Sequence, residues 1–376
     1  MKKVLLFIVA AIALGLVYLT FGKQAAPLSS DSQSAALLHP GQHTVQAGSL
    51  SLIDKSRATD SNGDYEGSDE RSFKLFIWRP KQRLASPQPL LVYSHGFMSD
   101  GQGGEYLAKY LASHGYTVVA PTYPLTHYSA PGGANSADVV NQPADIRFII
   151  DTLLQRNKDQ GDALFNTIDP SRIAAAGLSL GGMTTTLAAF HPEYAEQRIS
   201  AAISIAGPAY MFSKRFFADR SIPFMMVASP QDALVNYIDN AADIRSKVDG
   251  AVLVSIDGAS HTGFGGMAKW LRWMNNPDSI GCDAVMDNID LTAGESWLTE
   301  IGSADIGVVE SELPAMCTMN PLPKAMNPLR QQQLNTLAVA SFLNCHFLQE
   351  TDAAERSCLF LKSAFQNEIA EVRVEL

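Results

Sequence analysis

Apolar residues form two kinds of pattern along the chain. Short apolar runs, such as residues 89–93 (PLLVY) and 199–206, are typical of buried strands. In other stretches the apolar residues recur every three or four positions, most clearly in residues 145–155 (DIRFIIDTLLQ), and this spacing predicts helices that pack by one face. Strands that alternate with helices predict an α/β fold with a mostly parallel central sheet and helices on both faces.

The pattern predicts the following elements. Strands are expected at residues 50–53, 73–78, 89–93, 117–120, 172–176, 199–206, 222–228 and 251–256, and helices at residues 105–114, 145–155, 182–190, 237–248 and 331–348. The alternation stops at about residues 263–327, a stretch that holds two of the four cysteines and three of the four tryptophans. We expect this stretch to be an insertion that precedes the C-terminal helix and is cross-linked by a disulfide.

The first 22 residues follow neither pattern. Lys2 and Lys3 precede an uncharged run from Val4 to Gly22, which as a helix spans roughly 28 Å, close to the thickness of a bilayer core. A cleaved signal peptide usually has a shorter apolar stretch. Residues 1–22 are therefore predicted to be an N-terminal membrane anchor, with a signal peptide as the alternative. Either one leaves the lysines in the cytoplasm and exports the rest of the chain.

The remaining chain divides into two parts. Residues 23–45 are small and polar and are predicted to be a tether, and residues 46–376 form the domain with its insertion. Of the whole chain, 46% of the residues are hydrophobic and 18% are charged, with a net charge of −10. These values predict a globular domain without a nucleic-acid partner. A membrane contact is expected only through an uncleaved N-terminal segment, and the oligomeric state is left open.

The cysteines agree with export. Cys282, Cys317, Cys345 and Cys358 all lie in the last quarter of the chain, and an even number of cysteines in an exported protein favours disulfides. Of the three possible pairings we favour Cys282–Cys317 and Cys345–Cys358, which join the nearest neighbours in sequence. Four buried free thiols are the alternative.

Residues 177–181 (GLSLG) form a GxSxG motif. The motif alone is weak evidence, but here it follows a predicted strand and precedes a predicted helix, which is the context of a nucleophile elbow. In such a turn the glycines leave room for a strained serine. The serine Oγ then lies at a helix N-terminus, where the helix dipole favours developing negative charge. Ser179 is therefore the candidate nucleophile.

A serine nucleophile needs a base and an acid that orients the base. After a nucleophile elbow these follow in the order acid, then histidine, on loops that succeed late strands. Asp232 comes four residues after the run at 222–228, and His261 comes five residues after the run at 251–256. Ser179, Asp232 and His261 are therefore the predicted catalytic triad.

An oxyanion hole needs two backbone N–H donors. Leu180, directly after the nucleophile, is expected to supply one. The loop at residues 94–98 (SHGFM) is expected to supply the other, with Phe97 as the donor. His95 is expected to form hydrogen bonds within this loop and not to act as a base.

Together, these segments resemble the α/β-hydrolase superfamily. The resemblance rests on YSHGF, GLSLGG, the acid after PFMMVA, and GASHTGF. Within the superfamily, residues 94–124 and the helix NQPADIRFIIDTLL resemble the dienelactone hydrolase and platelet-activating-factor acetylhydrolase-like branch. The resemblance covers about residues 48–262 and 331–348. Dienelactone hydrolases use a cysteine where this chain has Ser179, so the resemblance implies a serine carboxylesterase.

The sequence therefore predicts an exported serine hydrolase that cleaves carboxylic esters of short or medium acyl chain and needs no metal or organic cofactor. Phe97, Met98 and Tyr123 are candidates to line an apolar acyl pocket, as are Trp270 and Trp273 unless these tryptophans pack the insertion instead. Lipase, phospholipid acetylhydrolase, peptidase and acyltransferase activities use the same residues. A cell-envelope binding protein that has lost turnover is the alternative from another class.

Overall fold

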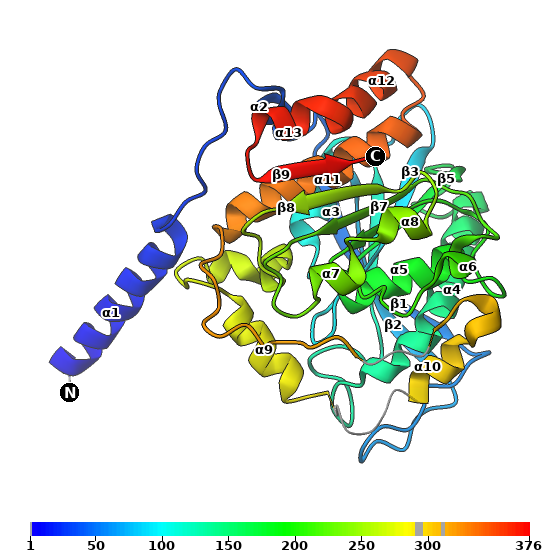
Figure 1. Cartoon of the computed structure of the whole chain (residues 1–376), viewed down its shortest axis with the longest axis horizontal. Helices are drawn as coiled ribbons and strands as arrows, with labels where there is room; N and C mark the ends of the chain where they lie inside the picture. Colours follow the sequence, from blue (N-terminus) through cyan, green and yellow to red (C-terminus); the bar gives the residue numbers. More distant parts are fainter. Residues whose placement is uncertain (1, 290–295, 310–312) are drawn as a thin grey trace.

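One sheet of nine strands runs through the molecule in a computed structural model that describes residues 2–289, 296–309 and 313–376 (Figure 1). Its order is β1-β2-β4-β3-β5-β6-β7-β8-β9. The middle six strands, β4 to β8 in that order, are parallel, and β1, β2 and β9 pair antiparallel to their neighbours. The predicted mostly parallel sheet is therefore confirmed. The strands are β1 (Val45–Asp54), β2 (Arg71–Pro80), β3 (Gln88–Ser94), β4 (Thr117–Thr122), β5 (Ile168–Leu178), β6 (Ile199–Ile205), β7 (Phe224–Ala228), β8 (Val252–Ile256) and β9 (Val372–Glu375).

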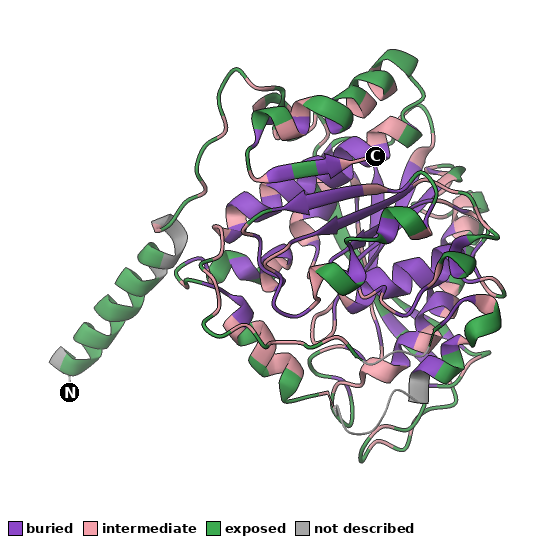
Figure 2. Ribbon diagram, viewed as in Figure 1, coloured by how far each residue is buried: buried purple, intermediate pink, exposed green. Residues whose placement is uncertain are grey.

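Helices cover both faces of the sheet because its central strands are apolar on both sides. Along β3, Leu90 and Val92 point to one face and Leu91 and Tyr93 to the other, as expected from the two-residue period of a strand. The helices α4 (Gln142–Lys158) and α5 (Leu180–Phe190) pack on the first face, and α3 (Glu105–Ser113) and α11 (Pro328–Phe347) pack on the second. Figure 2 shows the strands buried between these layers.

The prediction of one continuous helix at residues 237–248 is wrong. Two short helices, α7 (Tyr237–Asn240) and α8 (Ile244–Lys247), lie there instead. The break follows Asn240, which is buried and accepts hydrogen bonds from the backbone N–H groups of Ala209 and Tyr210. Asparagine is a weak helix former that readily bonds to nearby backbone, and here those bonds hold the chain at the break.

The C-terminal region contains elements that the sequence pattern did not predict. After α11 come α12 (Thr351–Leu359), α13 (Phe365–Glu368) and the edge strand β9. A disulfide between Cys345 and Cys358 joins α11 to α12, and a second joins Cys282 to Cys317. Both predicted pairings are therefore confirmed.

The predicted insertion at 263–327 is less irregular than expected, although residues 290–295 and 310–312 lie outside the described residues. It contains α9 (Asp278–Met286), α10 (Ser296–Ile301) and short 3₁₀ turns. Its apolar residues Leu298, Ile301 and Val308 are buried in the core beside α5. This segment is thus part of the body of the domain and is not confined to its surface.

The N-terminal segment begins as helix α1 (Lys2–Phe21), which extends away from the body with its described side chains exposed (Figures 1 and 2). Within the described residues, no helix combines the length and the hydropathy of a membrane span. The polar segment that follows contains α2 (Gln33–Leu37). There the Ser34 hydroxyl and N–H both donate to Glu368 of α13, so this part of the predicted tether packs on the domain.

Candidate active site

Ser179 occupies a sharp turn between the end of β5 and the start of α5. Its backbone has φ 55° and ψ −122°, a strained conformation for a residue other than glycine. The turn is closely packed, because a Cβ on Gly177 would lie 2.0 Å from the Gly181 oxygen and a Cβ on Gly181 would lie 2.2 Å from the Ser94 oxygen. The two glycines of the motif therefore allow the turn to form, and Ser179 remains half-buried beside it.

Asp232 and His261 meet at the carboxyl ends of β7 and β8. Asp232 Oδ2 lies 2.8 Å from His261 Nδ1, and Asp232 Oδ1 accepts hydrogen bonds from the N–H groups of Leu234 and Val235. The two side chains are buried, with His261 only 6% exposed. Burial by itself lowers the pKa of His261, but the charge and hydrogen bond of Asp232, together with the charge of Asp278, outweigh it and hold that pKa above its usual value.

The loop after His261 lies against the serine turn. A Cβ on Gly265 would lie 3.9 Å from Cδ2 of Leu178, the residue before Ser179. With Nδ1 of His261 engaged by Asp232, the other ring nitrogen, Nε2, is the one available to a serine hydroxyl. The fold thus brings all three predicted triad residues to one edge of the sheet.

The loop after β3 holds the second predicted oxyanion donor. His95 forms hydrogen bonds through both ring nitrogens, Nδ1 with the Gly96 oxygen at 2.8 Å and Nε2 with the Tyr123 N–H at 3.1 Å. Burial lowers the pKa of His95 to about 4, so the ring stays neutral near neutral pH. His95 therefore has the role expected from the sequence, which is to shape this loop.

The two predicted oxyanion donors are Phe97 and Leu180. No described residue accepts a hydrogen bond from the backbone N–H of either one. Next to Phe97, Met98 has φ 58°, another strained backbone conformation of a kind that gathers at functional sites. Both N–H groups thus remain free to bind an oxygen from a substrate.

The predicted acyl-pocket residues differ in their surroundings. Tyr123 is fully buried, and its hydroxyl is hydrogen-bonded to Ser94 Oγ at 2.8 Å, so its proposed place in the pocket lining is wrong. Phe97 and Met98 are half-buried. Trp270 and Trp273 are 42% and 49% exposed, so neither is packed into the core.

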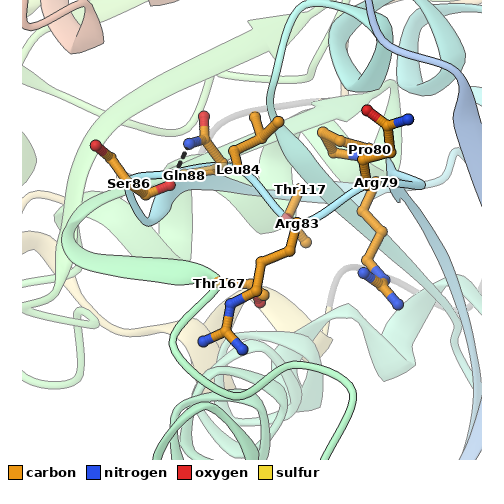
Figure 3. Close-up of a pocket in the computed structure, with 9 residues that line it drawn as sticks. Arg79, Pro80, Arg83, Leu84, Ser86, Gln88, Thr117 and Thr167 are labelled. Atoms are coloured by element: carbon orange, nitrogen blue, oxygen red, sulfur yellow. Dashed lines mark hydrogen bonds between the residues drawn. The ribbon is translucent and has the colours of Figure 1, made fainter.

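Two hollows lie away from these residues. One, of about 20 Å³, opens at the amino ends of β3 and β4, between Arg79, Arg83 and Gln88 (Figure 3). It lies at the opposite edge of the sheet from Ser179. Its volume has room for about one water molecule. A larger hollow of about 400 Å³ lies between α3, α11 and the N-terminal segment, beside Tyr106 and Gln332. No residue of the candidate triad lines either hollow.

Sequence patterns missed two residues beside the site. Asp278, at the start of α9, accepts a hydrogen bond from the backbone N–H of His261 at 2.9 Å. Gln331, in α11, bonds to both the N–H and the oxygen of Ser260, at 3.1 and 2.6 Å. The only sequence signal for Asp278 is an acidic residue after Asn-Pro, which is typical of a helix start and says nothing about a distant histidine.

Comparisons with known proteins identify a related family and a similar fold. Residues 84–272 match the model of a family described as PET hydrolase-like (PETase). Among solved structures, a ferulic acid esterase from Streptomyces cinnamoneus is similar, with a TM-score of 0.53 and 17% identity, covering 84% of this chain and 97% of that chain; at this identity the likeness shows the fold alone. No curated protein matches the chain.

Proposed function

The chain belongs to the PET hydrolase-like family of α/β-hydrolases, and on that premise we propose that it is an exported serine esterase with a triad of Ser179, His261 and Asp232. The observation that carries this proposal is the 2.8 Å contact between His261 Nδ1 and Asp232 Oδ2, at the sheet edge where the strained Ser179 turn lies. An acid–histidine pair beside a nucleophile elbow is the arrangement that activates a serine hydroxyl.

The proposed reaction gives each of these residues one role. His261 Nε2 takes the proton of Ser179 Oγ while Oγ attacks the ester carbonyl carbon. Asp232 holds the Nδ1–H tautomer and stabilises the imidazolium that forms. The N–H groups of Phe97 and Leu180 bind the oxygen that becomes negatively charged. The tetrahedral intermediate collapses as His261 returns its proton to the leaving alcohol, and water then cleaves the acyl-enzyme by the same steps.

For the substrate, we propose a carboxylic ester with a short or medium acyl chain. Phe97 and Met98 support an apolar contact for the acyl group, since both are half-buried in the loop that also holds an oxyanion donor. One structural relative is a ferulic acid esterase, so an ester of this aromatic acid is the second candidate. A lipase or phospholipid acetylhydrolase would instead prefer long acyl chains or a phospholipid.

Export is supported by the two disulfides, Cys282–Cys317 and Cys345–Cys358. Such bonds form and persist in oxidising compartments outside the cytoplasm. We propose that the apolar helix α1, with Lys2 before its apolar run, directs this export.

The test is hydrolysis of p-nitrophenyl esters from acetate to palmitate, together with methyl ferulate, by the purified protein and its Ser179→Ala variant. We expect the wild type to cleave the shorter esters and the variant to lose turnover. Ser171→Ala, a substitution of an exposed serine, is the matched control and should retain full activity.

Labelling by a fluorophosphonate probe separates the remaining possibilities. Ser179 should take up the probe only if it is activated, and Ser179→Ala should not. A folded wild type that neither cleaves an ester nor takes up the probe would contradict the proposal and favour a binding protein on the same fold. Labelling without turnover of these esters would show that the substrate class is wrong.

A further inference from the structure

We infer that Asp278 is a positioning residue for the His261–Asp232 pair, and that the segment bridged by Cys282 and Cys317 carries it into place. This inference rests on the proposed function. Asp278 is fully buried, and it lies beyond residues 84–272, the part of the chain that matches the family model.

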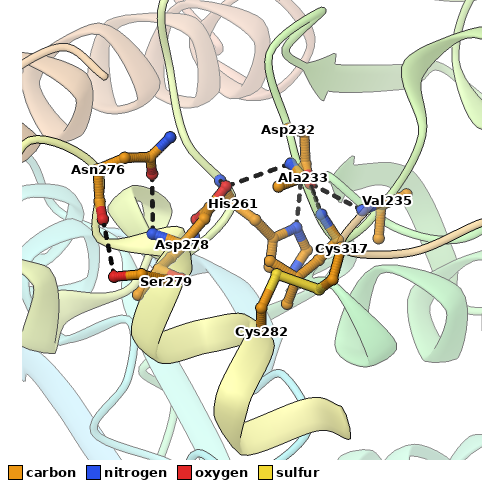
Figure 4. The surroundings of a disulfide bond; sticks show 11 residues. Asp232, Ala233, Val235, His261, Asn276, Asp278, Ser279, Cys282 and Cys317 are labelled. Atoms are coloured by element: carbon orange, nitrogen blue, oxygen red, sulfur yellow. Dashed lines mark hydrogen bonds and ion pairs between the residues drawn. A yellow bond between two sulfur atoms is a disulfide. The ribbon is translucent and has the colours of Figure 1, made fainter. Parts of the chain in front are cut away.

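The carboxylate of Asp278 joins the two loops of the acid and the base (Figure 4). Its Oδ2 accepts hydrogen bonds from the N–H of His261 at 2.9 Å and from the N–H of Ala233 at 3.2 Å, and its Oδ1 accepts one from the N–H of Thr262 at 2.7 Å. Ala233 directly follows Asp232. One side chain therefore fixes the backbone beside both members of a pair that is 29 residues apart in sequence.

These bonds are not ordinary helix capping. An aspartate in the first turn of a helix usually bonds to N–H groups of its own helix. The described residues that donate to the Asp278 carboxylate all lie in other segments, and the N–H of Asp278 itself donates to Asn276 Oδ1. The side chain is thus turned away from α9 and toward the candidate active site.

The disulfide-bridged segment contacts the acid loop a second time. The N–H of Cys317 donates to the Ala233 oxygen at 2.6 Å, so Ala233 is held by Asp278 through its N–H and by Cys317 through its oxygen. Cys282 lies one turn after Asp278 in α9, and its disulfide to Cys317 joins the two contacts (Figure 4). Cys317, which contacts the loop that holds Asp232, has φ 59°, a strained backbone conformation.

Helix α9 also packs closely on both loops. A Cβ on Gly281 would lie 2.2 Å from Thr262 Oγ1 and 3.6 Å from a methyl carbon of Leu234. Thr262 follows His261, and Leu234 lies two residues after Asp232. The absence of a side chain at Gly281 lets α9 approach closely enough for Asp278 to reach both loops.

The charge of Asp278 also acts on the histidine. Burial lowers the pKa of His261, and the charges of Asp232 and Asp278 raise it. Gln331, which holds the residue before His261 from α11, is neutral. In the described residues, the charged groups that act on His261 are therefore Asp232 and Asp278. Loss of the Asp278 charge should lower the pKa of His261.

The experiment compares Asp278→Asn and Asp278→Glu with the wild type in the full-length protein, using the p-nitrophenyl ester that the wild type cleaves best. Asparagine replaces one acceptor oxygen by a donor, so at least one of the three N–H groups loses its partner. We expect kcat to fall on the order of 10- to 100-fold with little change in KM, and the acid limb of the kcat/KM profile to move to lower pH. Glutamate keeps the charge and should keep the acid limb at its wild-type pH.

Asp283→Asn is the matched control. It removes one carboxylate from the same helix, but Asp283 is exposed, and within the described residues its side chain forms no hydrogen bond or ion pair with either loop. Its kcat and pH profile should equal those of the wild type. A merely structural role for Asp278 would lower the amount of folded enzyme without moving the pH profile of what remains.

A second pair of variants covers the case in which Asp278→Asn does not fold. Cys282→Ser with Cys317→Ser should lower kcat and the rate of fluorophosphonate labelling, because it releases the bridged segment from Ala233. Cys345→Ser with Cys358→Ser removes the other disulfide, which joins α11 to α12, and should leave both rates unchanged per folded molecule.

The outcomes separate the two proposals. Wild-type kcat and an unmoved acid limb in folded Asp278→Asn would overturn the positioning role while leaving the esterase intact. If that variant does not fold, wild-type rates in the folded Cys282→Ser, Cys317→Ser variant would overturn it instead. A wild type without esterase activity and without labelling would overturn the proposed function itself.

Discussion

His261 Nδ1 and Asp232 Oδ2 lie 2.8 Å apart, in surroundings that leave both side chains almost inaccessible to solvent. The pKa of His261 is raised, because the charge and hydrogen bond of Asp232, together with the charge of Asp278, outweigh the opposing effect of burial. The proposed base must be neutral to accept the serine proton. This geometry therefore predicts how activity depends on pH.

We expect kcat/KM to be low in acid and to rise with pH, with a midpoint above 6.5, the ordinary pKa of histidine. The measurement is kcat/KM for one p-nitrophenyl ester across the pH range, corrected for spontaneous hydrolysis. The raised pKa should also stabilise the folded protein. This stabilisation is fully present at pH below the pKa that His261 has in the unfolded chain, and it is lost as the pH rises through the pKa that His261 has in the folded protein. A midpoint at or below 6.5 would contradict the assignment.

Asp232→Asn should lower kcat on the order of 10⁴-fold while the protein stays folded. The asparagine oxygen can still accept hydrogen bonds from the N–H groups of Leu234 and Val235, but its NH₂ group then faces His261 Nδ1 and favours the wrong tautomer. Asp257→Asn is the matched control, because Asp257 is exposed near His261 and pairs with Arg373. Equal losses in the two variants would show that Asp232 has no special role.

The central sheet was predictable because its strands are continuous apolar runs. All five residues of β7 are buried. A short run of apolar residues is typical of a strand in a parallel sheet that helices cover on both faces. The positions of Asp232 and His261 were predictable for the same reason, since each follows such a strand at short distance. Their contact at 2.8 Å then follows from the parallel neighbours β7 and β8.

Other parts depend on contacts between distant segments. The break after Asn240 arises from bonds to Ala209 and Tyr210, about thirty residues earlier in the chain, and no local pattern encodes it. Strand β9 has only four residues, too few for alternation to be convincing. Asp278 lies in a stretch without clear periodicity, and the hydrogen bond that it accepts from the N–H of His261 is visible only in the structure.

Gly181→Ala should prevent the serine turn from forming. A Cβ at this position would lie 2.2 Å from the Ser94 oxygen and 2.6 Å from the His95 oxygen, and buried backbone atoms at the end of a central strand have little freedom to move. We expect loss of activity and a marked fall in the yield of folded protein, measured by circular dichroism and probe labelling. Gly48→Ala, where the nearest atom would be 3.8 Å away, is the control and should behave as the wild type.

Arg71→Met should cost stability, because Arg71 is the cation of a buried ion network. Its guanidinium bonds to both oxygens of Asp145 at 2.7 Å and to both oxygens of Asp138 at 2.8 and 3.0 Å, and Arg71 and Asp145 are fully buried. Removal of the cation leaves two carboxylates together out of water. Of these two carboxylates, Arg57 pairs with Asp145 alone, and it is shared with Asp54. We expect the free energy of unfolding to fall by about 3–5 kcal/mol, measured by urea denaturation.

The control for this prediction is Arg215→Met, which breaks an equally short pair with Asp219 at the surface, where both side chains are about half exposed. Solvent screens such a pair and each charge regains water when its partner is lost, so the unfolding midpoint should not change measurably. Arg71 joins β2 to α4 and lies outside the candidate triad, so any Arg71→Met protein that remains folded should keep the wild-type kcat. A loss of stability no larger than that of Arg215→Met would show that the buried carboxylates find other partners or take up protons at little cost.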